Sequence, residues 1–257
     1  DGNFWSSTML KGLDFQSIRL EGQSYLIEKF INQPVEKEWK QILSQQKKPD
    51  LEKLPDLPEG WCWVTTDQLL DFVTSGSRGW ARYYSDSGAI FLRIGNLDHN
   101  TIDLDLKDLQ KVSLPSATEG MRTRVTENDI LVSITADVGM IGLVPGDIGE
   151  AYINQHISLA RPVELINAKY LAWFLASQSG QKQFKDLQRG ATKMGLGLDD
   201  IKNINVPFPP LQEQEKIVLE IERQLTVAES QYGLFDQSLR RISRLRQSIL
   251  GEAFNGR

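Results

Sequence analysis

The chain has 257 residues, of which 40% are hydrophobic and 25% are charged, and its formal net charge is −5. This composition is typical of a soluble globular protein, and the acidic balance excludes a polycation that coats nucleic acid nonspecifically. A single cysteine cannot form an intrachain disulfide, and with only two histidines a metal cluster is not expected. We therefore expect no metal and no cofactor. With no apolar run of membrane-spanning length and no visible signal peptide, a cytoplasmic location is expected.

The first part of the chain, residues 1–57, is expected to form a partly helical spacer arm. Residues 25–45 carry a helical pattern of apolar residues, and Pro34 interrupts it. Polar residues 45–50 and the prolines that follow continue the segment as a linker. The chain begins with Asp1 and not with methionine, as a fragment of a longer protein would.

Residues 58–210 are expected to form a globular α+β domain. The predicted strands are residues 61–65, 89–94, 129–135, 140–144, 151–161 and 205–208. Thr66 or Asp67 is predicted to cap a short helical turn, and Asn167 to cap an amphipathic helix that runs to about Leu187, with Gly190 following its C-terminus. Because the strands come first and the helix late, the sheet should be twisted and mostly antiparallel or mixed.

Residues 211–257 are predicted to form one long helix, because no proline occurs between Gln212 and Ala253. Its apolar residues recur at alternating steps of four and three, as in a coiled-coil seam: Ile221, Leu225, Ala228, Tyr232, Phe235, Leu239 and Ile242, continued by Leu245 and Ile249. Such a seam needs a partner helix, from a second copy or from elsewhere in a longer chain. The alternative is that the helix folds back on its own domain.

Complete catalytic motifs are missing from the sequence. Gly195-Leu196-Gly197 is too short for a dinucleotide or phosphate-binding fingerprint. Residues 206–210 (VPFPP) have the residue types of the loop with which amino-methyltransferases hold a flipped base, but in the wrong order and without its Asn or Asp. We therefore expect no catalytic residues.

A loop at residues 75–84 is the first candidate for contact with DNA. It interleaves arginine with aromatic and hydroxyl side chains, and the candidate residues are Ser77, Arg78, Trp80, Arg82, Tyr83 and Tyr84. Arginine can bind guanine or phosphate, and aromatic and hydroxyl groups can contact methyls and sugars. The alternative is that the loop folds over its own core and buries its aromatic rings.

A second candidate segment contains Arg189, Thr192 and Lys193, which follow a predicted helix in a glycine-flanked loop where phosphate can approach the backbone. Arg122 and Arg124 suit either contact with phosphate or a solvated face, and the solvated face is favoured. The run of polar residues at 154–156 (NQH) suits either adenine contacts or buried structural hydrogen bonds.

Several motifs, taken in order, resemble one family. They are residues 57–61 (LPEGW), 91–97 (FLRIGNL), 129–133 (DILVS) and 203–214 (NINVPFPPLQEQ), with residues 180–192 also fitting. Across about residues 54–257 the chain is similar to specificity subunits of type I restriction-modification systems.

The resemblance implies a non-catalytic subunit with a target-recognition domain at residues 58–210 and a conserved coiled-coil helix at 211–257. Such subunits carry two such domains, each reading half of a bipartite site in double-stranded DNA, and their two helices pack antiparallel as a ruler. Methyltransferase subunits, which bind S-adenosylmethionine, and a restriction subunit are the implied partners.

This chain departs from the family pattern because it has one recognition domain and one helix. It is therefore expected to be the C-terminal half of a subunit or a half-subunit that dimerises. Two alternatives remain at this point. The chain is a detached recognition domain of a fused methyltransferase-nuclease, or it is a structural dimerisation module without a DNA role.

Overall fold

A computed structural model describes residues 54–76, 78–114, 120–164, 166–190 and 195–254, together with Pro49. The predicted spacer arm therefore lies almost entirely outside the described residues. The chain divides into two units that meet between Gln214 and Glu215. Among the described helices, none is long and apolar enough to cross a membrane.

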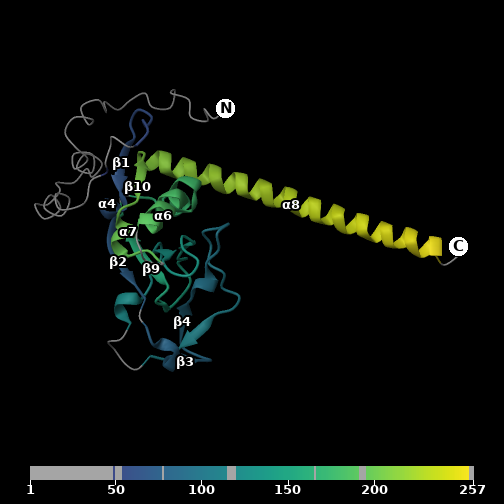
Figure 1. The fold of residues 1–257 in the computed structure, drawn as a ribbon, viewed down its shortest axis with the longest axis horizontal. Helices are drawn as coiled ribbons and strands as arrows, with labels where there is room; N and C mark the ends of the chain where they lie inside the picture. Colours follow the sequence, from purple (N-terminus) through teal and green to yellow (C-terminus); the bar gives the residue numbers. More distant parts are fainter. Residues whose placement is uncertain are drawn as a thin grey trace, which may run out of the picture. The chain divides into compact units, whose positions relative to one another are not determined.

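The described part of the first unit contains three small sheets (Figure 1). In the first, the predicted strands β1 (Cys62–Thr65) and β10 (Asn205–Phe208) pair antiparallel. The second is antiparallel and has the order β2 (Leu70–Ser75), β9 (Ile157–Pro162), β6 (Ile130–Ser133), β7 (Ile141–Leu143).

The third sheet is mixed, because β4 and β8 run parallel in it. Its order is β3 (Tyr84–Ser85), β5 (Gln110–Val112), β4 (Ala89–Leu92), β8 (Ala151–Ile153). In Figure 1, β1 and β10 lie at one end of this unit and β3 and β4 at the other. The α+β class is confirmed, as is the expectation of mixed strand directions.

The prediction of one strand over residues 151–161 is wrong, because a turn at 154–156 divides it into β8 and β9, which belong to different sheets. The Asn154 side chain accepts a hydrogen bond from the His156 backbone N–H at 3.0 Å, and its carbonyl accepts one from Ile157 at 3.1 Å. Both halves are apolar and buried, so the pattern of hydrophobicity did not reveal the break.

The core lies between the second and third sheets and contains Leu92, Leu131, Ile153 and Leu159. A smaller aromatic cluster covers the opposite face of the third sheet and contains Trp80, Phe91, Val112 and Tyr152. Side chains alternate between the faces of a strand. Leu92 therefore enters the main core while its neighbour Phe91 enters the aromatic cluster.

The short helix α4 (Thr66–Leu69) begins one residue earlier than predicted, since Thr65 is its N-cap and the Gln68 side chain accepts from the Thr65 N–H at 3.0 Å. The helix α7 (Leu198–Lys202) was not predicted. Both pack beside strand β2.

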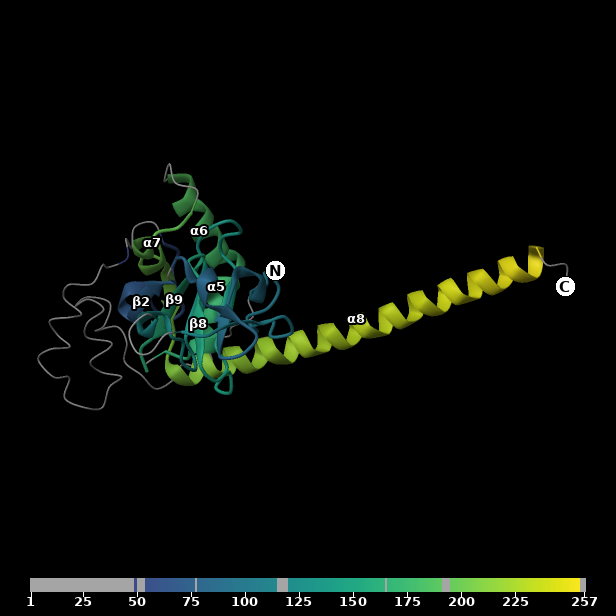
Figure 2. The same ribbon diagram turned by 90° about the horizontal axis from the view of Figure 1, so that it is seen from below.

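The helix predicted from Asn167 is in fact two helices, α5 (Ala168–Ala176) and α6 (Gln178–Gly190), drawn in Figure 2. Asn167 caps α5 as predicted, its side chain accepting from the Tyr170 N–H at 3.2 Å. The break lies at Ser177, whose hydroxyl donates to the Phe174 carbonyl at 2.6 Å and accepts from the Gly180 N–H at 3.4 Å. These local bonds compete with helix continuation.

The long C-terminal helix is confirmed as α8 (Leu211–Phe254), whose 44 residues extend roughly 66 Å at 1.5 Å per residue. Two side chains of its first turn, which still belongs to the first unit, bond to other residues of that unit. The Trp61 indole donates to Glu213 at 2.7 Å, and Gln214, which is fully buried, accepts from the Asn167 N–H at 2.8 Å. The start of the helix after Pro210 is thereby fixed.

Candidate nucleic-acid interface

The loop at residues 75–84 is built around one buried aromatic side chain. The 3₁₀ helix η3 (Trp80–Tyr83) follows Gly79, which has a left-handed φ of +79°. Trp80 is only 4% exposed and stacks on Phe91, with ring centroids 5.2 Å apart and an interplanar angle of 17°. The Tyr152 ring packs against Trp80, with ring centroids 5.4 Å apart. Trp80 is therefore a core residue that anchors the loop.

The charged side chains of this loop remain at the surface. Arg78 and Arg82 are exposed, and the Arg82 guanidinium lies 4.6 Å from the ring centroid of the half-buried Tyr83. Tyr84 is 44% exposed. The structure thus buries Trp80 and leaves both arginines exposed, and contact of this loop with DNA stays a prediction. Ser77 lies outside the described residues.

The loop begins in direct contact with the turn at residues 154–156. A Cβ on Gly76 would lie 2.0 Å from the Asn154 carbonyl oxygen, and the Gly76 N–H donates to the Ile157 carbonyl at 3.1 Å. The obstructing atoms belong to the backbone and cannot rotate away. Only glycine fits at position 76, and this close approach fixes where the loop leaves β2.

The other side of the same turn reaches the second candidate segment. His156 Nδ1 lies 2.5 Å from the Thr135 hydroxyl, and the Gln155 amide donates to His156 Nε2 at 3.1 Å. Nε2 is then the acceptor, so Nδ1 carries the proton and donates to Thr135. Thr135 forms an isolated β-bridge with Gly195. The side chain of Arg189, and Thr192 and Lys193, lie outside the described residues, but the glycine that ends their loop is tied to this turn.

A cavity of about 370 Å³ opens where the parallel strands β4 and β8 end. It is lined by Arg93, Ile94, Gly95, Asn96, Asp105, Asp108 and Asn154. The Asn96 side chain accepts from the Arg93 N–H at 2.8 Å and donates to the Asp105 carbonyl at 2.8 Å, which shapes the wall. The cavity brings an arginine and two aspartates beside the 154–156 turn.

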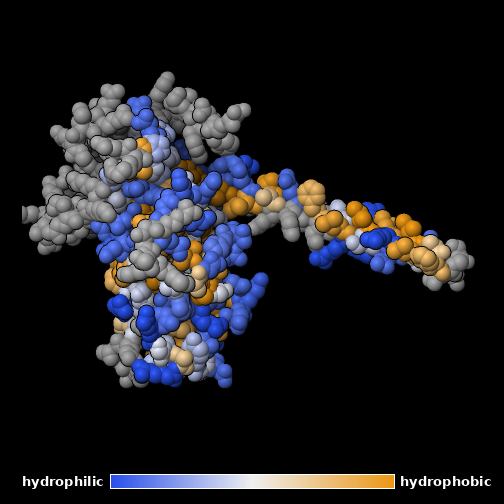
Figure 3. Space-filling view, in the orientation of Figure 1, coloured by the Kyte–Doolittle hydropathy of each residue, from blue (hydrophilic) through white to orange (hydrophobic). Residues whose placement is uncertain are grey.

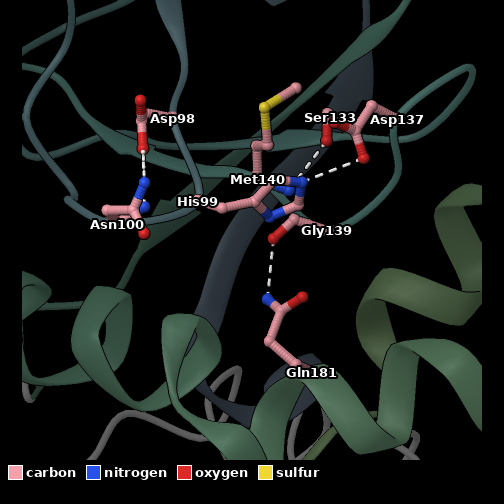
Figure 4. Close-up of polar contacts among 8 residues, drawn as sticks. All are labelled: Asp98, His99, Asn100, Ser133, Asp137, Gly139, Met140 and Gln181. Carbon is pink, nitrogen blue, oxygen red and sulfur yellow. Dashed lines mark hydrogen bonds and ion pairs between the residues drawn. The ribbon is translucent and has the colours of Figure 1, made fainter.

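The turn between β6 and β7 is held from several sides (Figure 4). The Ser133 hydroxyl accepts from the Met140 N–H at 2.8 Å, and Gln181 of α6 donates to the Gly139 carbonyl at 2.7 Å. Ala136 has a left-handed φ of 61°, a conformation that is costly for a residue with a side chain. These bonds hold the turn that carries Thr135 in one conformation.

An exposed histidine–aspartate pair connects the loop of His99 to this turn. His99 Nε2 is 2.9 Å from Asp137, as Figure 4 shows. Beside it, the hydrogen bonds that Asp98 accepts from the backbone and side-chain amides of Asn100 lower the pKa of the Asp98 carboxyl. The described residues contain no group of three or more side chains suited to hold a metal ion.

The residues that connect the two candidate segments are thus Asn154 to His156, none of which was chosen as a leading site residue from the sequence. The available signal was the run of three polar residues inside an otherwise apolar stretch. Period-two patterning favoured continuing the strand through them. The contacts with Gly76 and Thr135 come from distant parts of the chain and leave no local pattern.

Helix α8 carries exposed apolar side chains along much of its length, coloured orange in Figure 3. The predicted seam residues Phe235, Leu239, Ile242 and Ile249 are each more than 60% exposed, and Leu225 is 38% exposed. Ile221 is half-buried, and the side chain of Tyr232 lies outside the described residues. An apolar stripe this exposed is a surface suited to another helix.

Comparison with known families gives one matching model. The family model described as the type I restriction modification DNA specificity domain matches residues 91–223, which is more than half of the chain. The matched region includes strands β5 and β8 of the mixed sheet, the 154–156 turn and the start of α8.

Two curated relatives are specificity subunits of Escherichia coli type I restriction enzymes. The EcoBI subunit is 28% identical over 97% of this chain and 54% of its own length. The EcoKI subunit is 25% identical over 78% of this chain and 44% of its own length. The chain thus spans about half the length of the curated relatives it matches.

Two solved structures share the fold. One is a chain from a type I restriction-modification system studied for its assembly and conformational transition, with a TM-score of 0.64, 21% identity and coverage of 85% of this chain and 50% of that chain. The other is the HsdS subunit from Thermoanaerobacter tengcongensis, with a TM-score of 0.52, 23% identity and the same coverage.

Proposed function

Because the chain belongs to the type I restriction modification DNA specificity domain family, we propose that its first unit recognises one half of a bipartite sequence in double-stranded DNA. In this proposal the chain has no chemistry of its own. It selects the site at which partner subunits act.

The observation that carries the proposal is the pairing of exposed arginines with a buried anchor. Arg78 and Arg82 are at the surface of a loop whose Trp80 is locked between Phe91 and Tyr152. A recognition loop must hold its charged groups in register with DNA, and burying one large ring fixes the loop at little conformational cost. The contacts of the 154–156 turn with Gly76 and Thr135, and the bridge from Thr135 to Gly195, support a single surface. Thr192 and Lys193 lie outside the described residues and stay proposed DNA contacts on the ground of the sequence.

The proposed partners through the apolar stripe of α8 are a second copy of this chain or a second half of a longer subunit. Charge along the helix supports an antiparallel pairing. Acidic residues outnumber basic ones in its first part, which contains Glu213, Glu215, Glu220, Glu222, Glu229 and Asp236 but only Lys216 and Arg223 as basic residues. In its last part the balance is reversed, with Arg240, Arg241, Arg244 and Arg246 but only Glu252 as an acidic residue. An antiparallel partner sets acidic segments beside basic ones, and a parallel one sets like charges together.

Methyltransferase subunits, which would bind S-adenosylmethionine, and a restriction subunit are the further proposed partners. The relatives' names as specificity subunits of restriction enzymes support them. The exposed length of α8 provides a surface on which such subunits can assemble.

The test is selection of duplexes from a random library by the full chain together with its methyltransferase partner, followed by mapping of adenine methylation in cells that carry the system. We expect one short sequence to be enriched, and the same sequence to appear within a methylated bipartite site. Recovery of the library without enrichment would contradict the proposal and favour a purely structural module.

A further inference from the structure

The first unit contains a second pair of arginines beside the loop of Arg78 and Arg82. The 3₁₀ helix η5 (Met121–Thr123) carries Arg122, and Arg124 follows it directly. Both arginines are exposed. From the sequence, a solvated face was favoured for these two over contact with phosphate.

Trp80 connects the two segments. Gly120, which precedes η5 with a left-handed φ of +120°, lies so close to Trp80 that a Cβ there would be 2.7 Å from Cη2 of the indole ring. The ring that anchors the loop through Phe91 thus also forms the base on which η5 begins. One buried side chain therefore sets the positions of two basic turns.

Two further contacts hold η5 in place. Arg122 donates from Nη1 to the Thr74 hydroxyl at 2.7 Å, which ties it to the end of β2 just before the loop. Arg124 forms an isolated β-bridge with Tyr152, whose ring packs on Trp80. A guanidinium has five N–H donors, and among the described residues one of those of Arg122 has an acceptor, the Thr74 hydroxyl.

The local charge is positive although the whole chain is acidic. The described segments 78–85 and 120–126 contain four arginines and no acidic residue. In the sequence, Asp86, Glu119 and Glu127 directly border these segments, and Glu119 lies outside the described residues. Glu150 accepts a hydrogen bond from the Tyr152 hydroxyl at 2.6 Å. In Figure 3, strongly hydrophilic side chains gather at the end of the unit where Figure 1 places β3 and β4.

We propose that Arg78, Arg82, Arg122 and Arg124 form one platform, anchored by Trp80, that binds the phosphate backbone of the DNA duplex. Phosphate contacts fix the orientation of a protein on DNA but carry no sequence information. The platform therefore supplies affinity and register, while base choice comes from other side chains. This inference rests on the proposed function. It adds the residues that fix the position of the protein on DNA without selecting the base sequence.

The test compares the full chain, in complex with its methyltransferase partner, with the variant Arg122→Ala/Arg124→Ala. Each phosphate contact adds about 0.9 to the slope of log affinity against log salt, or ~8-fold in affinity between 1 M and 0.1 M salt. We expect the double variant to lose roughly 10- to 60-fold at 0.1 M salt and about 1 to 2 from the slope, equally on the selected duplex and on an unrelated duplex of the same length.

The matched control is Lys169→Ala/Lys202→Ala, which removes two positive charges from α5 and α7 of the same unit. It should leave affinity and slope within about twofold of the parent. The variant Arg122→Lys/Arg124→Lys, which keeps the charge, should retain most of the slope. A thermal melt of each variant establishes that it is folded before binding is measured.

The outcomes separate the two proposals. If the parent complex selects a site and the double alanine variant keeps its affinity and slope, the platform is wrong and the proposed function stands. If the lysine control loses as much DNA affinity as the arginine variant, the effect comes from net charge alone. That result also overturns the platform. If the variant loses its preference for the selected duplex but keeps its affinity for the unrelated duplex, these arginines contact bases and not phosphates. That result also overturns the platform. A parent that selects nothing would contradict the proposed function itself.

Discussion

Arg161 on β9 binds both carboxylate oxygens of Asp129, the residue before β6, with its Nε at 2.7 Å from Oδ1 and its Nη2 at 2.8 Å from Oδ2. The Asp129 side chain is fully buried, and it also accepts from the Thr126 N–H at 2.7 Å. These bonds raise the pKa of Arg161 further above its usual value. The pair joins the two central strands of the antiparallel sheet.

Replacing Asp129 by Asn should destabilise the first unit by about 3 to 5 kcal/mol, because an amide turns one acceptor into a donor that faces Arg161 while the site stays buried. Urea unfolding followed by tryptophan fluorescence measures the change. The exposed Asp147→Asn is the matched control and should shift stability by less than about 0.5 kcal/mol. Equal stability of the two variants would show that the pair does not support the sheet.

Trp80→Ala should cost about 3 to 5 kcal/mol, since it removes a ring that contacts Phe91, Tyr152 and Gly120. Trp80→Phe keeps part of the stacking and should cost clearly less. Thermal melts compare stability, and duplex binding below the melting temperature compares function. A folded Trp80→Ala chain that binds DNA like the parent would show that the anchor is not needed to position the arginines.

Gly76→Ala should displace the loop from the 154–156 turn, because the new methyl group would collide with the backbone carbonyls of Asn154 and Ile153. Overpacking of this kind costs about 1 to 3 kcal/mol. Hydrogen exchange of the Gly76 and Ile157 amides reports the change directly. Gly95→Ala is the control, since nothing obstructs a Cβ at that position. Unchanged protection in Gly76→Ala would contradict the close packing.

Leu239→Glu/Ile242→Glu should weaken helix pairing at least tenfold, because two carboxylates replace apolar groups in the seam. Sedimentation at several protein concentrations measures the assembly. Gln237→Glu/Ser248→Glu adds the same charge on the opposite helix face, beside Arg244, and should assemble like the parent. If both variants keep the parent's oligomeric state, the stripe is not the pairing surface of the free chain.

Cys62 should react slowly with iodoacetamide in the native protein. Burial raises the pKa of its thiol to about 12, so at pH 8 almost none is present as the reactive thiolate. We expect alkylation at least about 100-fold slower than in urea, measured by intact mass. Native labelling at the unfolded rate would mean that β1 and β10 separate readily in solution.

Patterns within one element were predicted well from the sequence. Asn167 caps α5, β10 precedes the Pro209-Pro210 break, and α8 continues without interruption. Each rests on local rules of capping, proline geometry or apolar spacing. The predicted DNA-contacting residues remain a proposal, and the structure adds that Trp80 is buried while Arg78 and Arg82 are exposed.

The sequence by itself determined the α+β class, the strands β1, β4, β6, β7 and β10, and the change at Pro210 from a globular unit to a long helix, because periodicity and turn residues act over short distances. Only the tertiary structure decided that β8 and β9 join different sheets, that Gly76 and Thr135 meet the same turn, and that Trp80 lies beneath two basic segments. Hydrophobic spacing indicates which face of a segment is buried. It does not indicate which distant segment covers that face, because this depends on packing and hydrogen bonding across the whole unit.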